Sequence, residues 1–153
     1  MQNSTIFLVD IRHLSYYSTF MNKRNQSRQT VPLPTEAELE ILNILWGTGP
    51  ATVREVHDAM TGKETGYTTI LKQMQVMTEK GLLVRNERYR SHVYEAGLSK
   101  QETQQQLARN LLRRAFDGSA KNLVLGALSS QPVSSSELAE IRKILDKFEK
   151  GAK

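Results

Sequence analysis

Residues 66–95 carry polar side chains at spacings that suit hydrogen bonding to DNA. The segment reads GYTTILKQMQVMTEKGLLVRNERYRSHVYE. Successive residues of a helix are about 100° apart, so Thr68, Lys72 and Gln75 share one face, with Thr69 on its flank. Their hydroxyl, ammonium and amide groups donate hydrogen bonds to base edges and to phosphate oxygens. The residue types and their spacing therefore predict a face that binds nucleic acid.

The opposite face of the same helix is apolar, which predicts that it is buried. Its residues are Ile70, Leu71, Met74 and Met77. We expect the helix to start at Tyr67 or Thr68, after the permissive Gly66, and to end at Gly81, where a glycine serves as a C-terminal cap. One helix would then be anchored on one side and free to bind on the other.

A short hairpin is predicted directly after this helix. Residues 82–84 are apolar and extended, residues 86–91 form a polar tip, and residues 92–94 alternate as a return strand. The tip carries Arg88 and Arg90, which suit contact with a phosphate backbone. The helix alone would more often be an ordinary amphipathic surface helix. The hairpin instead favours a recognition helix followed by a wing.

Two helices are predicted upstream, and each begins at a capping box, a threonine followed three residues later by glutamate. The boxes are Thr35 with Glu38 and Thr52 with Glu55, and residues 47–50, GTGP, separate the helices. The apolar residues expected inside are Leu39, Leu42, Ile44, Leu45 and Trp46 in the first helix and Val53, Val56, Ala59 and Met60 in the second. Three helices and a two-stranded ribbon over residues 34–98 form a winged helix-turn-helix, whose third helix enters the major groove.

Three more helices are expected in residues 99–153. Ser99 with Glu102 forms a third capping box, Asp117-Gly118 ends the first of these helices, and Ser134 with Glu137 forms a fourth box. This region is too small to bury its apolar residues in one copy, which predicts a dimerisation domain. The residues expected to carry dimerisation are Leu111, Leu123, Val124, Leu128, Leu138, Ile141, Leu145 and Phe148. The alternative is that these helices pack against the winged helix of the same chain.

Residues 1–33 lack hydrophobic periodicity and are rich in Ser, Asn, Gln and Thr, so we expect a disordered basic and polar arm. Lys23, Arg24 and Arg28 could touch DNA, although a solvated tail is the more ordinary interpretation. No apolar run approaches the roughly 18 residues of a membrane span. Residues 6–9 are too short for a signal peptide. The expected location is the cytoplasm.

The charge of the chain favours an anionic partner, but it is unevenly distributed. The net charge is +5 over 153 residues. Residues 35–98 carry seven basic and nine acidic groups, whereas residues 99–153 carry ten basic and six acidic groups. In the predicted winged helix-turn-helix, the acidic residues cluster at Glu36, Glu38 and Glu40, on an exposed face of the first helix. Its basic residues lie on the later helix and the wing. We therefore expect the two signs to separate by face.

The residue inventory argues against an enzyme or a metal protein. There is no cysteine, which excludes disulfides, thiolate metal sites and cysteine nucleophiles. The three histidines, His13, His57 and His92, are scattered over the chain without metal-ligand spacing or a glycine-rich loop nearby. The sequence predicts no catalytic residues, no metal and no cofactor.

Taken together, these segments resemble the BlaI/MecI/CopY family of bacterial repressors. The resemblance covers residues 34–150 and is carried by LPTEAELEILNILWGTGPATVREVH, the 66–83 helix, SKQETQQQLARNLLRRAFDGSAKNLVLGAL and SSSELAEIRKILDKFE. It implies a homodimer with an N-terminal winged helix and a C-terminal helical dimerisation domain. It also implies that Thr68, Thr69 and Lys72 face a dyad operator and that Arg88 and Arg90 face the flanking backbone.

Three features depart from the family pattern. Tyr89 stands in the wing turn where similar sequences commonly have Gly, and the absence of cysteine excludes the metal site of copper-responsive members. In β-lactam-responsive members a sensor metalloprotease cuts an Asn–Phe bond, and the matching position here holds Gly126 and Ala127. A sensor metalloprotease is therefore one candidate partner, but we expect no cut at this bond.

The sequence thus predicts a mainly α protein with a small β-hairpin wing that binds a dyad DNA operator as a homodimer and leaves it on a signal. The candidate DNA-binding residues are Tyr67, Thr68, Thr69, Lys72, Gln75, Arg88 and Arg90. The alternative is a winged-helix module that binds another protein. The net negative charge of the predicted winged helix favours this alternative. Steep loss of duplex binding with rising salt would distinguish the first function from the second.

Overall fold

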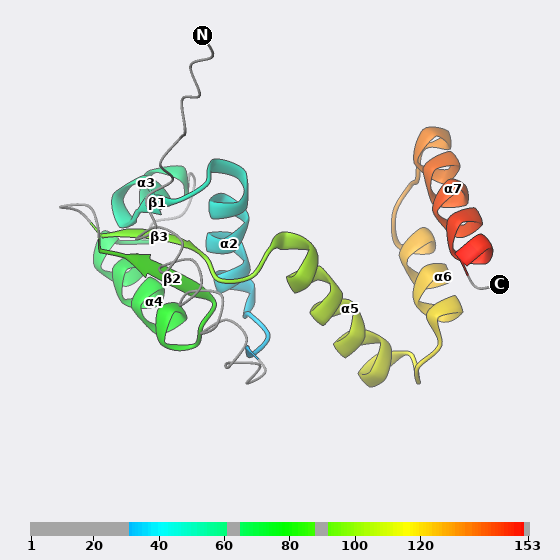
Figure 1. The fold of residues 1–153 in the computed structure, drawn as a ribbon, viewed down its shortest axis with the longest axis horizontal. Coiled ribbons are helices and arrows are strands. Elements are labelled where there is room, and N and C mark those ends of the chain that lie inside the picture. The colour runs from blue at the N-terminus through cyan, green and yellow to red at the C-terminus, as the bar shows by residue number, and fades with distance from the viewer. Residues whose placement is uncertain (1–30, 61–64, 88–91, 152–153) are drawn as a thin grey trace, which may run out of the picture. The chain divides into compact units, whose positions relative to one another are not determined.

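The computed structural model describes residues 31–60, 65–87 and 92–151, and it is mainly helical with a small antiparallel sheet (Figure 1). The chain divides into two compact units, the first ending at Thr103 and the second starting at Gln104. The first unit contains α2 (Glu36–Thr48), β1 (Ala51–Thr52), α3 (Val53–Ala59), α4 (Tyr67–Glu79), β2 (Leu83–Asn86) and β3 (Val93–Ala96). Helix α5 (Lys100–Ala115) crosses into the second unit, which also holds α6 (Ala120–Ser130) and α7 (Ser135–Gly151).

The helix starts follow the predicted capping boxes. At α2 the Thr35 hydroxyl accepts from the Glu38 backbone N–H while the Glu38 carboxylate accepts from the Thr35 N–H, and α3 repeats this arrangement with Thr52 and Glu55. At α5 the Ser99 N–H donates to the Glu102 carboxylate at 2.8 Å. Each reciprocal pair satisfies two N–H groups that the first turn leaves without helical partners, so these three helix starts were readable from the sequence.

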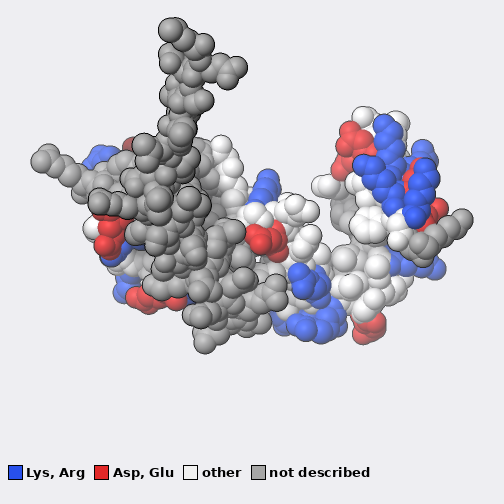
Figure 2. Space-filling model, in the orientation of Figure 1, with Lys and Arg blue, Asp and Glu red and all other residues white. Residues whose placement is uncertain are grey.

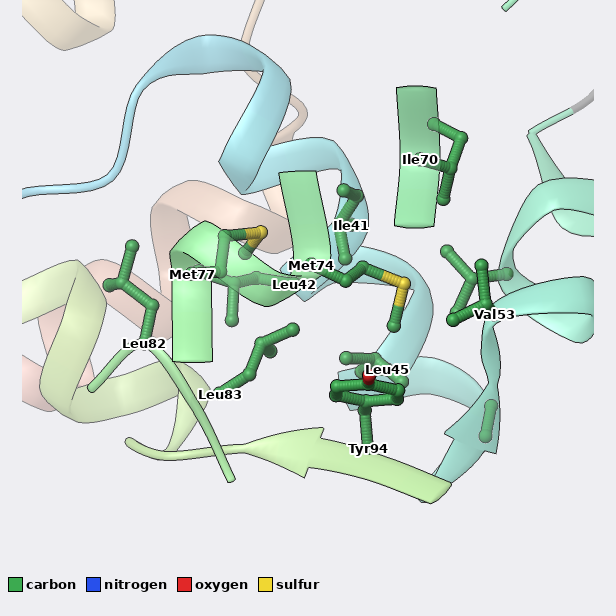
Figure 3. Packing of buried hydrophobic residues seen from close by; sticks show 12 residues of the cluster. Ile41, Leu42, Leu45, Val53, Ile70, Met74, Met77, Leu82, Leu83 and Tyr94 are labelled. Carbon is green, nitrogen blue, oxygen red and sulfur yellow. The ribbon is translucent and has the colours of Figure 1, made fainter. Parts of the chain in front are cut away.

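The core of the N-terminal unit lies between α2, α3, α4 and the sheet (Figure 3). Its buried hydrophobic residues are Ile41, Leu42, Leu45, Ala51, Val53, Val56, Ile70, Met74, Met77, Leu82, Leu83 and Tyr94. Ile41 was absent from the predicted apolar face of α2. The prediction that Ala59 points inward was wrong, because Ala59 ends α3 and is exposed, while Met60 after it is only partly buried. Leu71 is likewise only partly covered.

The sheet has three strands rather than the two that were predicted. Their order is β1-β3-β2, and both pairings are antiparallel. Ala51 pairs with Tyr94 and Thr52 with Val93, so the segment directly before α3 closes the outer side of the hairpin. A two-residue strand has no periodicity of its own, and its partner lies about 40 residues away, so its pairing could not be read locally.

Gly81 terminates α4 as predicted, two residues after the last helical residue Glu79, and adopts φ +78°. The Leu82 N–H donates to the Met77 carbonyl at 2.9 Å and the Gly81 N–H donates to the Thr78 carbonyl at 3.1 Å. These two bonds form a Schellman motif, and the buried side chains of Leu82 and Met77 supply the hydrophobic contact that accompanies it. The chain therefore turns from α4 directly into β2.

Gly97, just after β3, fixes the junction between α4 and the sheet. Its N–H donates to the Leu82 carbonyl at 2.8 Å, and a Cβ atom at this position would overlap the backbone carbonyl oxygen of Gly81. The next residue, Leu98, accepts a 3.0 Å hydrogen bond from the Trp46 indole N–H. Only glycine permits such a close backbone approach, which is a requirement that local patterning did not indicate.

An ion pair joins the start of α2 to the end of α4. The Lys80 ammonium lies 2.7 Å from Oε1 of Glu38, whose side chain is only 4% exposed. The expectation that Glu38 belongs to an exposed acidic face was therefore wrong. Burial raises the pKa of Glu38, but hydrogen bonds from Lys80 and Thr35 outweigh it, and the net pKa lies below the ordinary value of 4.5.

We predict that Gly97→Ala destabilises the N-terminal unit by about 1–3 kcal/mol, because the added methyl must displace the Gly81 backbone. Urea unfolding followed by Trp46 fluorescence measures this, since Trp46 is the only tryptophan of the chain. The control is Gly47→Ala in α2, where nothing lies within 4 Å of the added atom. Gly47→Ala should leave the unfolding midpoint equal or slightly higher. Equal midpoints for Gly97→Ala and wild type would contradict the prediction.

We predict that Lys80→Met costs about 1–2 kcal/mol at pH 7, because the buried Glu38 carboxylate loses a charge-assisted hydrogen bond. The stability gained from a lowered carboxylate pKa is complete above the unfolded-state pKa and is lost as pH falls through the folded-state pKa. The gap between wild type and Lys80→Met should therefore shrink below pH 4.5. Urea titrations at several pH values measure it. Two results would refute the stabilising role of the Glu38–Lys80 ion pair. One is a stability difference that does not change with pH, and the other is an equal stability loss in Lys72→Met, at an exposed position of α4.

Candidate nucleic-acid interface

The polar face of α4 is exposed along its length. Tyr67, Thr68, Thr69, Lys72 and Gln75 are all exposed, whereas the side of the helix that carries Ile70, Met74 and Met77 is fully buried. The structure therefore brings five of the seven predicted DNA-binding residues together on one continuous surface. We call the exposed side of α4, including Val76 and Glu79, the α4 face.

Val76 adds an apolar group to this otherwise polar surface. Its side chain is 37% exposed although the three core residues around it are not. The α4 face therefore offers hydroxyl groups, an ammonium, an amide, a carboxylate and a methyl-bearing side chain. Base edges in the major groove present donors, acceptors and the thymine methyl group, so the face carries a matching partner for each.

The N-terminus of α4 differs from those of its neighbours. The first turns of α2, α3 and α5 each contain an acidic residue, whereas that of α4 contains none. Gly66 stands at the N-cap with φ −65° and, having no side chain, provides no capping bond. The positive end of the helix dipole is thus left without a neutralising carboxylate from the first turn, which favours an approaching anion.

Residues 88–91 of the predicted wing tip, which include Arg88 and Arg90, lie outside the described residues. The two strands that lead into the tip are present, and β2 pairs with β3 in register from Leu83 opposite Ala96 to Asn86 opposite Val93. Arg85, near the end of β2, forms an ion pair with Glu87. The hairpin was correctly predicted, while the contacts of its two arginines stay a prediction.

Two side chains of α3 that the sequence reading did not single out as binding residues pack against Tyr67. The Arg54 guanidinium carbon lies 6.0 Å from the centroid of the Tyr67 ring, and the His57 ring meets it edge-on at 6.1 Å. Residues 54 and 67 belong to different helices, so no local spacing could have indicated this cluster.

The second candidate surface is apolar and lies in the C-terminal unit. Of the residues predicted to mediate dimerisation, Leu111, Val124, Leu145 and Phe148 are exposed, and Phe148 is 74% exposed. The others, Leu123, Leu128, Leu138 and Ile141, are half-buried. Leu125 and Ile144, which were not in that prediction, are exposed as well. We call these residues together the apolar surface of the C-terminal unit.

Neither a metal centre nor a membrane segment appears in the part of the chain that the structure describes. No three His, Asp or Glu side chains there lie close enough to share a metal ion. None of the described helices is long and apolar enough to cross a membrane.

Several known proteins are similar to this chain, either in structure or in sequence. Among solved structures, a MarR family protein from Bacillus stearothermophilus is similar at a TM-score of 0.43 and 18% identity, covering 92% of this chain and 91% of that one. The penicillinase repressor of Staphylococcus aureus is 24% identical over 115 residues, which are 74% of this chain and 91% of the repressor. The transcriptional regulator BlaI of Mycobacterium tuberculosis is 27% identical over 118 residues, 76% and 85% of the two chains. The penicillinase repressor family model matches residues 34–147, which are three-quarters of this chain. The chain therefore belongs to this family of transcriptional repressors.

Proposed function

We propose that this protein represses transcription by binding a DNA operator of dyad symmetry as a homodimer, in the cytoplasm, and that a signal releases it. The observation that carries the proposal is the α4 face, a row of hydrogen-bonding side chains on a helix whose other side is locked into the core. A helix about 10–12 Å in diameter fits the major groove, and a rigid backbone holds its donors in register with the base edges.

The apolar surface of the C-terminal unit supports the homodimer. A single copy leaves Phe148 74% and Leu125 60% exposed, and helices with several exposed large apolar side chains mark an interaction site. Charged side chains of both signs are exposed on α7 (Figure 2). Leu138, Ile141 and Leu145 recur three and four residues apart, so they share one side of this helix. A second copy of the same helices has the same apolar residues to offer, which is the self-complementarity that a two-fold interface needs.

Release on a signal is part of the proposal, and a sensor metalloprotease is the candidate partner. The bond between Gly126 and Ala127 lies in the middle of α6. A Cβ atom at Gly126 would lie 3.4 Å from the Phe116 ring, so α6 packs there on the residue that follows α5. This helix would have to open before a protease could bind the bond as an extended segment. Ala127 also lacks the aromatic ring of the family's Phe. Both facts favour a cut elsewhere, or another form of release.

The decisive experiment selects duplexes from a random library and measures their binding at two salt concentrations. A repressor should select a dyad sequence, and its affinity should fall steeply with salt because every phosphate contact releases counterions. Lys72→Ala should change the base preference at one position of each half-site, since a good base contact contributes about 1–3 kcal/mol of discrimination. Lys143→Ala, at an exposed position of α7, is the control and should leave the selected sequence unchanged.

Two results would count against this function. Weak binding with little salt dependence would favour the alternative, a winged-helix module that recognises another protein. Selection of the same sequence by Lys72→Ala, with equal losses on every duplex, would show that Lys72 contacts phosphate rather than a base edge.

We further predict that Ile141→Asp yields mostly monomer, because a carboxylate on the apolar side of α7 is costly to bury in an interface. Operator affinity should fall with it, since one half-site supplies only part of the contacts. Analytical ultracentrifugation at micromolar concentration measures the first effect and operator titration the second. The matched control is Glu140→Asp at the exposed neighbouring position, which should remain dimeric. A wild-type protein that sediments as a monomer would refute the homodimer.

A further inference from the structure

Two side chains of α3 pack against Tyr67, the first residue of α4, and the proposed recognition of bases does not explain this contact. Tyr67 is 43% exposed, yet two sides of its ring are occupied. The Arg54 guanidinium carbon lies 6.0 Å from its centroid, and the His57 ring stands at 71° to it with centroids 6.1 Å apart. The ring is therefore held as a surface against which Arg54 rests.

His57 has a polar neighbour at each ring nitrogen. Its Nε2 lies 3.0 Å from the Thr65 carbonyl oxygen, which can only accept, so Nε2–H is the donor. Its Nδ1 lies 3.3 Å from the Asp58 carboxylate, which also only accepts, so the bond to Thr65 is the one that a neutral ring makes. Thr65 directly precedes the N-cap of α4, so this bond ties α3 to the chain entering α4. The position of the Tyr67 ring is thus set from α3.

The acidic neighbour of Arg54 is engaged elsewhere. The Glu55 carboxylate accepts from the Thr52 N–H at 2.7 Å and from the Thr52 hydroxyl at 2.8 Å, as part of the α3 capping box. These bonds lower the pKa of Glu55, so it keeps its charge but points to the helix start. Arg54 is exposed and beside an aromatic face. A guanidinium in this setting keeps its donors directed away from the ring, toward solvent.

We propose that Arg54 binds a phosphate of the DNA backbone and that Tyr67 acts as a positioning residue for it rather than as a reader of bases. This inference rests on the proposed function. In helix-turn-helix proteins the helix before the recognition helix crosses the backbone, and α3 holds that place here. The guanidinium binds phosphate oxygens through two parallel hydrogen bonds. Stacking on Tyr67 limits the orientations of a flexible side chain before DNA arrives.

The experiment measures duplex affinity of the full-length protein from about 50 to 200 mM salt. Arg54→Ala should weaken binding roughly tenfold at low salt, equally on all sequences, and should reduce the salt slope by about one per half-site. Arg54→Lys should keep most of the slope, because it retains the charge, and still lose affinity, because it cannot stack as a plane. Lys143→Ala is the charge-matched control and should keep both.

Tyr67 variants test the positioning role. Tyr67→Phe keeps the ring and should bind like wild type, whereas Tyr67→Leu should weaken binding on all sequences. Because the ring acts through Arg54, the double variant Arg54→Ala/Tyr67→Leu should bind no more weakly than Arg54→Ala alone. Urea unfolding followed by Trp46 fluorescence identifies any variant that loses affinity by failing to fold.

Several outcomes would overturn the inference. An unchanged salt slope in folded Arg54→Ala would remove the phosphate contact. Independent losses in the double variant, or a loss in Tyr67→Phe as large as in Tyr67→Leu, would show that Tyr67 touches DNA directly. A wild-type protein without salt-dependent duplex binding would overturn the proposed function and this inference together, whereas the other outcomes leave the proposed function standing.

Discussion

The burial of one side of α4 is the constraint on which the candidate interface depends. Ile70, Met74 and Met77 are completely inaccessible, and their side chains point into the shared core of α2, α3 and the sheet (Figure 3). A helix held over about two turns cannot rotate about its axis without exposing this apolar surface, which costs about 25 cal/mol per Å². The polar residues at the intervening positions are therefore presented in one fixed orientation, which is what recognition of base edges requires.

The C-terminal unit differs, because its helices are stabilised by local capping and not by a buried core in one copy. Its helices are regular and capped, since the hydroxyl of Ser119 accepts from the Asn122 N–H and that of Ser134 from the Glu137 N–H. The turn after α5 uses two consecutive left-handed residues, Asp117 at φ 47° and Gly118 at φ 78°. No apolar side chain of α6 or α7 is fully buried in one copy. Local signals thus make the helices, while the apolar surface that they leave supports the proposed association of two copies.

The sequence by itself determined the parts of this protein that depend on neighbours three or four residues apart. Capping boxes located the starts of α2, α3 and α5, the glycine at position 81 located the end of α4, and apolar spacing separated the buried from the exposed side of α4. These signals act within one or two turns of helix, where side-chain geometry is nearly independent of the rest of the chain. The mainly helical fold, the hairpin and the α4 face could therefore be predicted.

Only the tertiary structure decided the contacts between distant segments. The strand Ala51–Thr52 exists because β3 pairs with it, and Glu38 is buried because Lys80, 42 residues later, supplies its counter-charge. Gly97 is required by the approach of another backbone, and Arg54 meets Tyr67 only when α3 and α4 pack together. Such contacts form only when segments many residues apart come together, and a local sequence pattern does not indicate which distant residues will meet. The physical reason is that helix caps and periodicity are local, whereas ion pairs, close backbone approaches and ring contacts form only in the folded chain.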